Sequence, residues 1–195
     1  NEVADYHFSQ SGDLKEFLLT DQFLVNTYKA RNTNLGYALH EINRQVSGGQ
    51  HSNELLNTEL FYSIAESIVA DQAIIYEQYS RLQFKKTETR QSLFRQLLEA
   101  REYMDAHLSD DIHLDQIIRN AFMSKYHFIR LFKATFILSP YQYILRKRLE
   151  SARVQLLGGS NVTETAFDAG YPDSSSFSKA FKAAFGVTPS SVKLK

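Results

Sequence analysis

Two stretches of this chain are near copies of each other: FIRLFKATFILSP at residues 128–140 and FSKAFKAAFGVTP at residues 177–189. They align at a constant offset of 49 residues, and six positions are identical, among them three phenylalanines. Arg130 aligns with Lys179, which keeps the positive charge. Upstream, residues 114–123 resemble residues 162–171 at an offset of 48, so the second copy holds one extra residue. Such self-similarity predicts a duplicated structural unit.

Each copy has the pattern of a helix, a short turn and a second helix. In the first copy, residues 112–136, the turn is Phe122–Met123, and Ser124 is a natural N-cap for the second helix. In the second copy, residues 161–185, Gly170 suits a turn with positive φ, and Asp173 or Ser174 caps the next helix. The apolar faces before the turns are Leu114, Ile117, Ile118 and Ala121, and Val162, Ala166 and Ala169. This is the frame of a DNA-reading motif, although a duplicated hairpin without a ligand fits it as well.

Helical periodicity divides the second helix of each copy into two faces. The predicted inward faces are Phe128, Leu131, Phe132 and Thr135 in one copy and Phe177, Ala180, Phe181 and Ala184 in the other. The predicted outward faces are Tyr126, Ile129, Arg130 and Lys133, and Ser175, Ser178, Lys179 and Lys182. Both helices therefore present a cation at the same repeat position. Phe136 and Phe185 are expected in the core with the other repeated phenylalanines.

The outward faces contain candidate DNA contacts, since arginine binds O6 and N7 of guanine with two hydrogen bonds and lysine reaches the same acceptors. We predict base-reading roles for Tyr126, Ile129, Arg130, Ser175 and Lys179. Predicted phosphate contacts, which position the protein without reading sequence, are Ser124, Lys125, Lys133, Arg146, Ser174, Ser178 and Lys182. For any single cation the alternative is a solvated surface charge. Ile129 either touches a thymine methyl group or packs on a neighbouring helix.

A helix between the two copies is predicted from Pro140 to Leu157. Ser139 and Pro140 supply an N-cap and a first-turn proline, and Gly158–Gly159 ends the helix. Its 18 residues span ~27 Å, near the ~34 Å between successive major grooves on one face of a duplex. A rigid helix of this length could hold two recognition helices near that spacing. For Arg146 and Arg153, phosphate contact and pairing with Glu150 are both open.

The charge distribution is uneven although the net charge is zero. Residues 1–91 carry 8 basic and 12 acidic side chains, whereas residues 112–195 carry 12 basic and 5 acidic ones. A basic half favours a polyanionic partner. The absence of cysteine excludes disulfides and cysteine zinc sites, and the six histidines form no recognisable ligand set. We expect no catalytic residue, no metal and no cofactor.

The first half of the chain is predicted to be helical. Apolar spacing predicts helices over residues 35–46, 55–82 and 92–107, with a polar linker at residues 85–89. The inward side chains of the third helix are expected to be Leu93, Leu97, Ala100, Tyr103 and Met104. Residues 1–34 fit short strands or helix turns. The apolar stripe within residues 54–84, which includes Ile64, Ile68, Ile75 and Tyr79, is either a homodimer surface or buried in the monomer.

Residues 93–193 resemble the C-terminal DNA-binding domain of AraC/XylS-type transcription regulators. The likeness rests on residues 124–133, on Ser139-Pro140, Tyr143, Arg148-Leu149 and Ala152, and on Gly170-Tyr171, Asp173, Ser176-Phe177, Phe181-Lys182, Phe185-Gly186 and Thr188-Pro189. The resemblance implies two helix-turn-helix units joined by a linker helix, with base-reading residues on the second helix of each unit. The chain departs from the family pattern at Phe122, where glycine is usual, and at Ile118, where a small residue is usual.

The predicted protein is mainly α-helical, with an N-terminal region at residues 1–88 for dimerisation or regulation and a DNA-binding domain at residues 92–195. In the family that it resembles, the N-terminal part often holds a small β-barrel, which would not fit into residues 1–34. The chain begins at Asn1 rather than Met. It is therefore expected to be either a regulator without a barrel or part of a longer protein.

Three classes of function compete. A sequence-specific transcription regulator would bind double-stranded DNA in the cytoplasm, associated with the nucleoid, and would also contact RNA polymerase where it activates. A DNA-repair alkyl acceptor is set aside because the chain has no cysteine. A helical protein-interaction module with a degenerate DNA face would show no salt-sensitive affinity for DNA. No run of ~18 apolar residues predicts a membrane span, so we expect no membrane partner.

Overall fold

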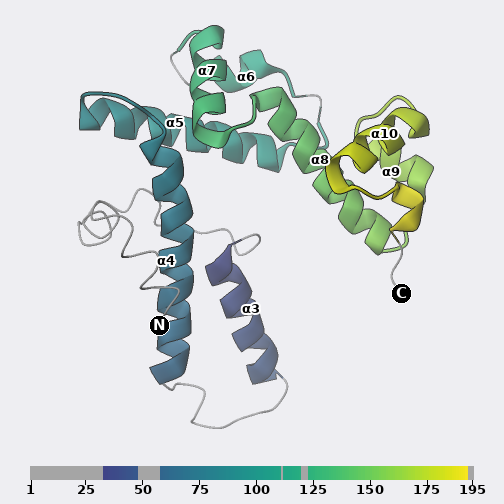
Figure 1. The fold of residues 1–195 in the computed structure, drawn as a ribbon, viewed down its shortest axis with the longest axis horizontal. Coiled ribbons are helices and arrows are strands. Elements are labelled where there is room, and N and C mark those ends of the chain that lie inside the picture. Colours follow the sequence, from purple (N-terminus) through teal and green to yellow (C-terminus); the bar gives the residue numbers. More distant parts are fainter. Residues whose placement is uncertain (1–32, 48–57, 111, 120–122, 193–195) are drawn as a thin grey trace. The chain divides into compact units, whose positions relative to one another are not determined.

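The computed structural model describes residues 33–47, 58–110, 112–119 and 123–192. Within these ranges the chain is helical and contains no strand, which confirms the predicted mainly α-helical class. The chain divides into two compact units, residues 1–91 and 92–195, and the division lies within helix α5, Thr87–Ala106 (Figure 1). The prediction for residues 1–32 lies outside the described residues.

Helices α3, Asn34–Ser47, and α4, Thr58–Ser80, pack against each other in the first unit (Figure 1). The carboxylate of Asp71, a buried residue of α4, accepts hydrogen bonds from the backbone N–H groups of Asn34 (2.9 Å) and Leu35 (3.0 Å). Because the first N–H groups of a helix have no partner within it, this carboxylate caps α3 from the neighbouring helix. The pairing of α3 with α4 therefore has a polar as well as an apolar component.

The apolar stripe of α4 faces inward. Ile75 and Tyr79 are buried, and Ile64 and Ile68 are half-buried, so burial within the monomer is the alternative that the structure favours for these residues. Residues 54–57 of the predicted surface lie outside the described residues. The exposed apolar side chains of α4 are a different set, namely Phe61, Tyr62 and Ile74.

The polar linker predicted at residues 85–89 is wrong in part, because α5 begins at Thr87 and continues to Ala106. Polarity does not prevent a helix, and Glu88 in the first turn suits the positive end of the helix dipole. The guanidinium of Arg90 lies 3.9 Å from the centre of the Tyr79 ring and donates to the Tyr79 carbonyl over 2.9 Å.

Tyr103, predicted to face inward, is 38% exposed and stacks on His107, whereas Phe94 is buried.

Helix α8, Pro140–Leu157, is the centre of the second unit and has the predicted bounds. Its N-terminus carries a capping box, in which Ser139 Oγ accepts from the Gln142 N–H and the Gln142 side chain accepts from the Ser139 N–H. Helix α7, Lys125–Phe136, packs on α6, Leu114–Arg119, and on α8. Helices α9, Val162–Asp168, and α10, Ser174–Phe185, also pack on α8, and a short 3₁₀ helix, Pro189–Ser191, follows.

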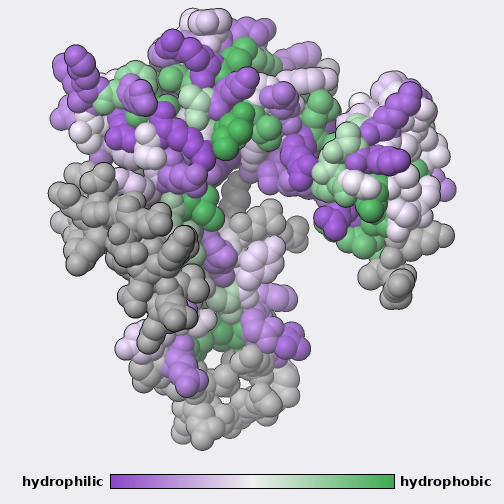
Figure 2. Space-filling view, viewed as in Figure 1, coloured by the Kyte–Doolittle hydropathy of each residue, from purple (hydrophilic) through white to green (hydrophobic). Residues whose placement is uncertain are grey.

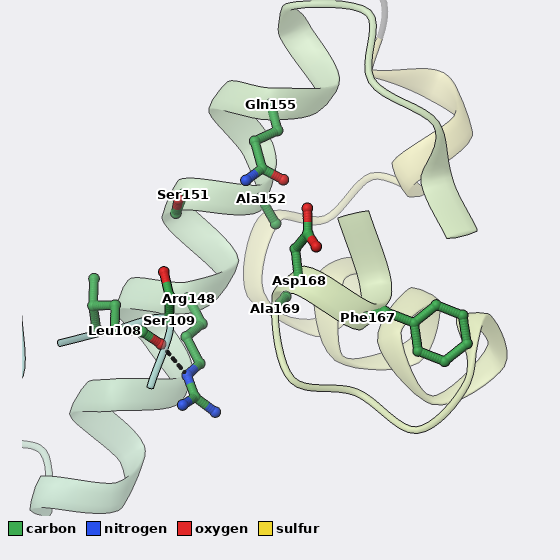
Figure 3. A pocket seen from close by; sticks show the side chains of 9 residues that line it. All are labelled: Leu108, Ser109, Arg148, Ser151, Ala152, Gln155, Phe167, Asp168 and Ala169. Atoms are coloured by element: carbon green, nitrogen blue, oxygen red, sulfur yellow. Dashed lines mark hydrogen bonds between the residues drawn. The ribbon is translucent and has the colours of Figure 1, made fainter. Parts of the chain in front are cut away.

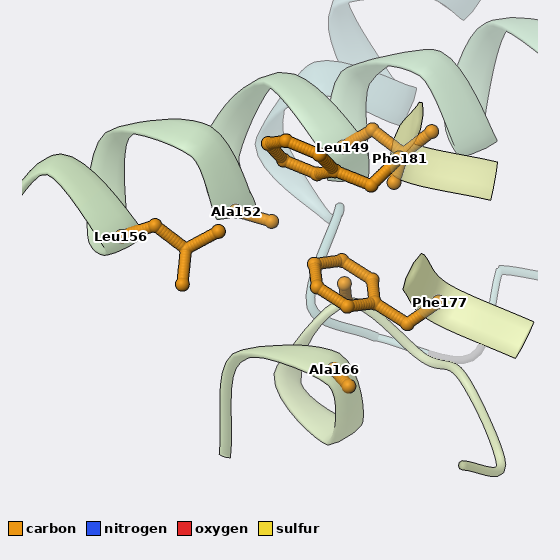
Figure 4. Packing of buried hydrophobic residues seen from close by; sticks show 7 residues of the cluster. Leu149, Ala152, Leu156, Ala166, Phe177 and Phe181 are labelled. Atoms are coloured by element: carbon orange, nitrogen blue, oxygen red, sulfur yellow. The ribbon is translucent and has the colours of Figure 1, made fainter. Parts of the chain in front are cut away.

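The repeated phenylalanines form two similar cores. Phe128 and Phe132 are fully buried with ring centres 5.6 Å apart, and Phe177 and Phe181 are fully buried with ring centres 5.5 Å apart. In the second core these rings meet Leu149, Ala152 and Leu156 of α8 and Ala166 of α9 (Figure 4), and the C-cap residue Ala169 belongs to the same cluster. Burial of each phenylalanine is worth about 1.5–3 kcal/mol, which makes these rings the main apolar contribution to each unit.

Phe136 and Phe185 lie at the edges of the two cores and are half-buried, in contrast to the full burial of the other four repeated phenylalanines. Guanidinium groups cover their open faces. The Arg101 guanidinium lies 5.1 Å from the Phe136 ring centre, and that of Arg146 lies 4.9 Å from the Phe185 ring centre. A cation over an aromatic face is attracted by the ring quadrupole, so these arginines complete the core edges.

Candidate nucleic-acid interface

Helix α7 presents the first candidate surface. Ser124 caps it as predicted, with its Oγ accepting from the His127 N–H over 3.3 Å. The predicted inward face is buried at all four positions, Phe128, Leu131, Phe132 and Thr135. On the opposite side Tyr126 is 78% exposed, and Arg130 and Lys133 are exposed. Ile129 is half-buried between the two faces, which leaves part of its side chain accessible.

Helix α10 presents the second candidate surface. Of the two caps that the sequence left open, Asp173 is the one used. Its carboxylate accepts from the Ser176 N–H over 2.7 Å and from the Ser176 hydroxyl over 2.9 Å. The backbone hydrogen bond from Ser176 holds the pKa of Asp173 below its ordinary value. The turn before the helix contains Gly170 with a φ of +79°, the left-handed conformation that favours glycine.

The faces of α10 follow the predicted division. Phe177 and Phe181 are buried, and Ala180 and Ala184 are half-buried against the core. The outward side chains Ser175, Lys179 and Lys182 are exposed, and Ser178 is half-buried. The small residues at inward positions explain why this helix can lie close to its neighbours.

The two helices are equivalent in register. Helices α6 and α9 begin 48 residues apart, at Leu114 and Val162, whereas α7 and α10 begin 49 residues apart, at Lys125 and Ser174. The extra residue of the second copy therefore lies between its two helices, as the sequence alignment predicted. Arg130 and Lys179 are the sixth residues of α7 and α10. The fold thus places one exposed cation at the same position of each second helix.

Four of the predicted phosphate contacts have partners within the chain, and one of them is Ser124, whose hydroxyl accepts from the His127 N–H. Lys125 Nζ lies 3.0 Å from a carboxylate oxygen of Asp115, and Ser174 Oγ lies 3.3 Å from the Thr163 hydroxyl. Arg146 pairs with Glu150 over 3.1 Å and donates to the carbonyl of Ala184, also over 3.1 Å. Pairing with Glu150 was one of the two alternatives for Arg146. The exposed Lys125–Asp115 pair is weak enough to exchange for a phosphate, whereas Arg146 has several partners to lose.

Exposed charge alone would not identify these surfaces. Figure 2 shows hydrophilic side chains interspersed with small apolar patches over the visible face of the second unit, so hydrophilic side chains are not confined to one place. What distinguishes α7 and α10 is the repeated register of cation, hydroxyl and buried phenylalanine. In the sequence, Arg148 stands out only in the Arg148-Leu149 pair that resembles the family pattern. Its three-way contact, described below, has no signal in local spacing.

The described residues contain no group of three or more His, Cys, Asp or Glu side chains arranged to hold a metal ion. Among the same residues, no helix is both long and apolar enough to cross a membrane.

Comparisons with known proteins agree with this geometry. Residues 117–194 match a family model described as a helix-turn-helix domain. The probable transcriptional regulator LumQ of Photobacterium leiognathi is 35% identical over 89 residues, which cover 45% of this chain and 36% of LumQ. The regulatory protein PocR of Salmonella typhimurium is 34% identical over 92 residues, covering 47% of this chain and 30% of PocR.

A third relative, the regulatory protein SoxS of Salmonella typhimurium, is 29% identical over 90 residues, which cover 46% of this chain and 84% of SoxS. The chain therefore matches about a third of the length of LumQ and PocR but most of SoxS. The family model matches the part of the chain that holds α7 to α10. Residues 117–194 are accordingly a helix-turn-helix domain, in which two helix-turn-helix units are joined by α8.

Proposed function

We propose that this chain is a sequence-specific transcription regulator that reads two adjacent major grooves of one DNA duplex with α7 and α10. The observation that supports it is the repeated exposed face, with Arg130 and Lys179 in equivalent places on helices whose opposite sides are anchored by buried phenylalanines. A rigidly backed helix is needed because base readout requires side chains to be held at fixed positions in the groove.

Each candidate side chain has a distinct role in this proposal. On α7, Arg130 binds a guanine edge, Tyr126 donates from its hydroxyl, and the accessible part of Ile129 touches a thymine methyl group. On α10, Lys179 and Ser175 take the corresponding positions. Lys133, Lys182, Ser178 and Ser124 contact phosphates, and Lys125 and Ser174 would do so after exchanging their internal partners. Arg146 is the weakest of the phosphate candidates because of its bonds to Glu150 and Ala184.

Further features of the whole protein belong to the same proposal. The chain acts in the cytoplasm by binding DNA and catalyses no reaction on it. Residues 1–88 support regulation or dimerisation, and the domain at residues 92–195 contacts RNA polymerase where the protein activates. Because Ile75 and Tyr79 are buried, a homodimer would use the exposed Phe61, Tyr62 and Ile74 of α4.

Selection from random-sequence duplex DNA tests the proposal. The parent chain is expected to enrich two short sequence blocks about one helical turn apart. Arg130→Ala should blur one block and Lys179→Ala the other, each with a loss of about 1–3 kcal/mol in binding free energy. Arg95→Ala is a matched control, since Arg95 is an exposed arginine of α5 and belongs to neither recognition helix. Weak, unselective binding that neither variant changes would refute the proposal and favour a protein-interaction module.

A further inference from the structure

Arg148 lies near the middle of α8 and contacts the segment that leads into the first helix-turn-helix unit. Its Nε donates to the Leu108 carbonyl over 2.8 Å (Figure 3), and its Nη2 donates to the Asp110 carbonyl over 2.7 Å. Leu108 and Asp110 follow α5 and precede α6. The guanidinium therefore holds two carbonyls at the entry to the first unit.

The same guanidinium lies against the turn of the second helix-turn-helix unit. A Cβ placed on Gly170 would come within 2.6 Å of Arg148 Nη1, so the bare backbone of Gly170 is what makes room for it. Gly170 is in the turn between α9 and α10, and its φ of +79° fixes the path of the chain into α10. One side chain thus reaches the entry of α6 and the turn before α10.

A cleft separates the segments that Arg148 joins. It has a volume of about 380 Å³ and is lined by Leu108 and Ser109 of the segment between α5 and α6 and by Phe167, Asp168 and Ala169 of the second helix-turn-helix unit, with α8 forming its floor (Figure 3). Both helix-turn-helix units pack on α8, and Arg148 adds a polar tie beside this cleft. A planar guanidinium suits this role because its donors are rigidly oriented and two of them bind carbonyls at once.

The second tie between α8 and α10 lies at the other end of the recognition helix. Arg146 Nη1 donates to the carbonyl of Ala184 in the last turn of α10 over 3.1 Å. Helix α10 is therefore held to α8 near its C-terminus by Arg146, while Arg148 abuts the turn before its N-terminus. Arg148 differs from Arg146 in that it also holds the segment that enters the first helix-turn-helix unit.

We propose that Arg148 is a positioning residue that sets the distance and angle between α7 and α10, and thereby the spacing of the two DNA blocks that the protein accepts. The part concerning DNA rests on the proposed function. The part concerning the two helices does not, and each can be measured separately.

Spin labels on the two recognition helices test the positioning role without DNA. Ala134→Cys and Ala183→Cys are equivalent exposed positions on α7 and α10, and the natural chain contains no cysteine that would also take a label. Pulsed electron–electron double resonance on the doubly labelled chain should give one narrow distribution of the distance between the two labels. Adding Arg148→Ala should broaden it at least about twofold, because the entry of α6 and the turn before α10 lose the side chain that contacts both of them. A distribution of unchanged width and mean would overturn the proposal.

Two more variants keep the test decisive. Arg148→Lys retains the charge and the aliphatic stem but cannot hold two carbonyls with a planar fork, so it should broaden the distribution even if Arg148→Ala fails to fold. Arg153→Ala removes a guanidinium from the same helix that lies over Phe185 and makes no bond to Leu108 or Asp110, and it should leave the distribution narrow. Equal broadening by Arg153→Ala would overturn a specific role for Arg148.

A second experiment measures affinity for DNA. It uses the two-block sequence that the parent chain selects and two altered duplexes, with one base pair added or removed between the blocks. The parent should lose at least about tenfold in affinity on the altered spacings, about 1.4 kcal/mol. Arg148→Lys should bind all three with similar affinity while keeping the base preferences within each block. A spacing preference that survives in Arg148→Lys contradicts the inference. If the parent selects no two-block sequence, the proposed function fails while the spin-label result still stands.

Discussion

The C-cap residue that follows α7 is Ile137, with a φ of +70°, and the C-cap residue that follows α10 is Gly186, with a φ of +74°. Both residues donate their N–H to the carbonyl four residues earlier, at Lys133 and Lys182. The repeat therefore ends both helices with a positive φ and the same backbone hydrogen bond, once at glycine and once at a β-branched residue that is disfavoured there. Ile137 is also 63% exposed, so burial does not offset the backbone strain.

Ile137→Gly is expected to raise the free energy of unfolding by about 1 kcal/mol, because the relief of left-handed strain exceeds the entropic cost of glycine. Chemical denaturation followed by circular dichroism measures it. Gly186→Ala is the reciprocal variant and should lower stability by about 1 kcal/mol, since space around Gly186 is open and only the φ is unfavourable. A destabilised Ile137→Gly would show that the isoleucine side chain contributes a contact that outweighs the strain.

The cap at Asp173 makes the stability of α10 dependent on pH. Its pKa is lowered in the folded chain by the backbone hydrogen bond from Ser176. The stabilisation is therefore complete above the unfolded pKa, about 3.9, and declines as pH falls through the lower folded value. We expect the stability difference between the parent and Asp173→Ala to shrink under acidic conditions. Asp173→Asn keeps an acceptor at every pH and should abolish this dependence. A difference that stays constant as the pH falls would rule out the carboxylate as the cap.

At the scale of elements, α8 holds α5 as well as the recognition helices. The Tyr143 hydroxyl of α8 donates to a carboxylate oxygen of Asp105 on α5 over 2.8 Å, and the Tyr143 ring packs edge-on against Phe132, with ring centres 5.7 Å apart. Burial, followed by the nearby Asp105 charge, raises the pKa of Tyr143. The neutral hydroxyl is therefore retained as a donor throughout the physiological range.

Tyr143→Phe should lower the free energy of unfolding by about 0.5–1.5 kcal/mol, because the ring packing is kept and one hydrogen bond to a carboxylate is lost. Urea denaturation provides the measurement. Tyr126→Phe is the control, because the Tyr126 ring is 78% exposed and its hydroxyl has no role in the fold. Equal effects of the two substitutions would mean that the Asp105 contact is not formed in solution.

At the scale of the molecule, the excess of basic residues after position 112 gives the DNA-binding half a salt-dependent attraction to phosphates. Lys133→Ala and Lys182→Ala should each reduce the slope of log affinity against log salt by about 0.9, and the selected sequence should not change. Lys85→Ala, an exposed cation outside this half, is the control. An unchanged slope in both variants would remove these lysines from the interface.

Self-association also belongs to this scale. If α4 forms a homodimer surface, sedimentation velocity at high micromolar concentration should detect a dimer, and Phe61→Glu should dissociate it by placing a charge in an apolar contact. Tyr37→Glu, on an exposed side chain of α3, tests whether the neighbouring helix takes part. A parent chain that sediments as a monomer under these conditions argues against the surface.

The sequence alone determined the duplicated units, the bounds of α8, the Ser124 cap and the two faces of α7 and α10. These features depend on periodicity, caps and turn residues, which act over a few neighbouring positions. The register of Arg130 and Lys179 followed from the repeat for the same reason. The start of α5 at Thr87 differs from the linker predicted at residues 85–89, because polar residues are as compatible with a helix as with a linker.

Only the tertiary structure decided which partners the long polar side chains take. Arg146 reaches the Ala184 carbonyl across 38 residues, and Arg148 reaches the Leu108 carbonyl across 40. Likewise, only packing decided that Ile75 and Tyr79 are buried while Phe61 and Tyr62 are exposed. A flexible cationic side chain on a helix can reach many hydrogen-bond acceptors. The sequence of an apolar stripe does not specify which surface covers it. Their contacts are set by the three-dimensional arrangement of segments that are distant in sequence.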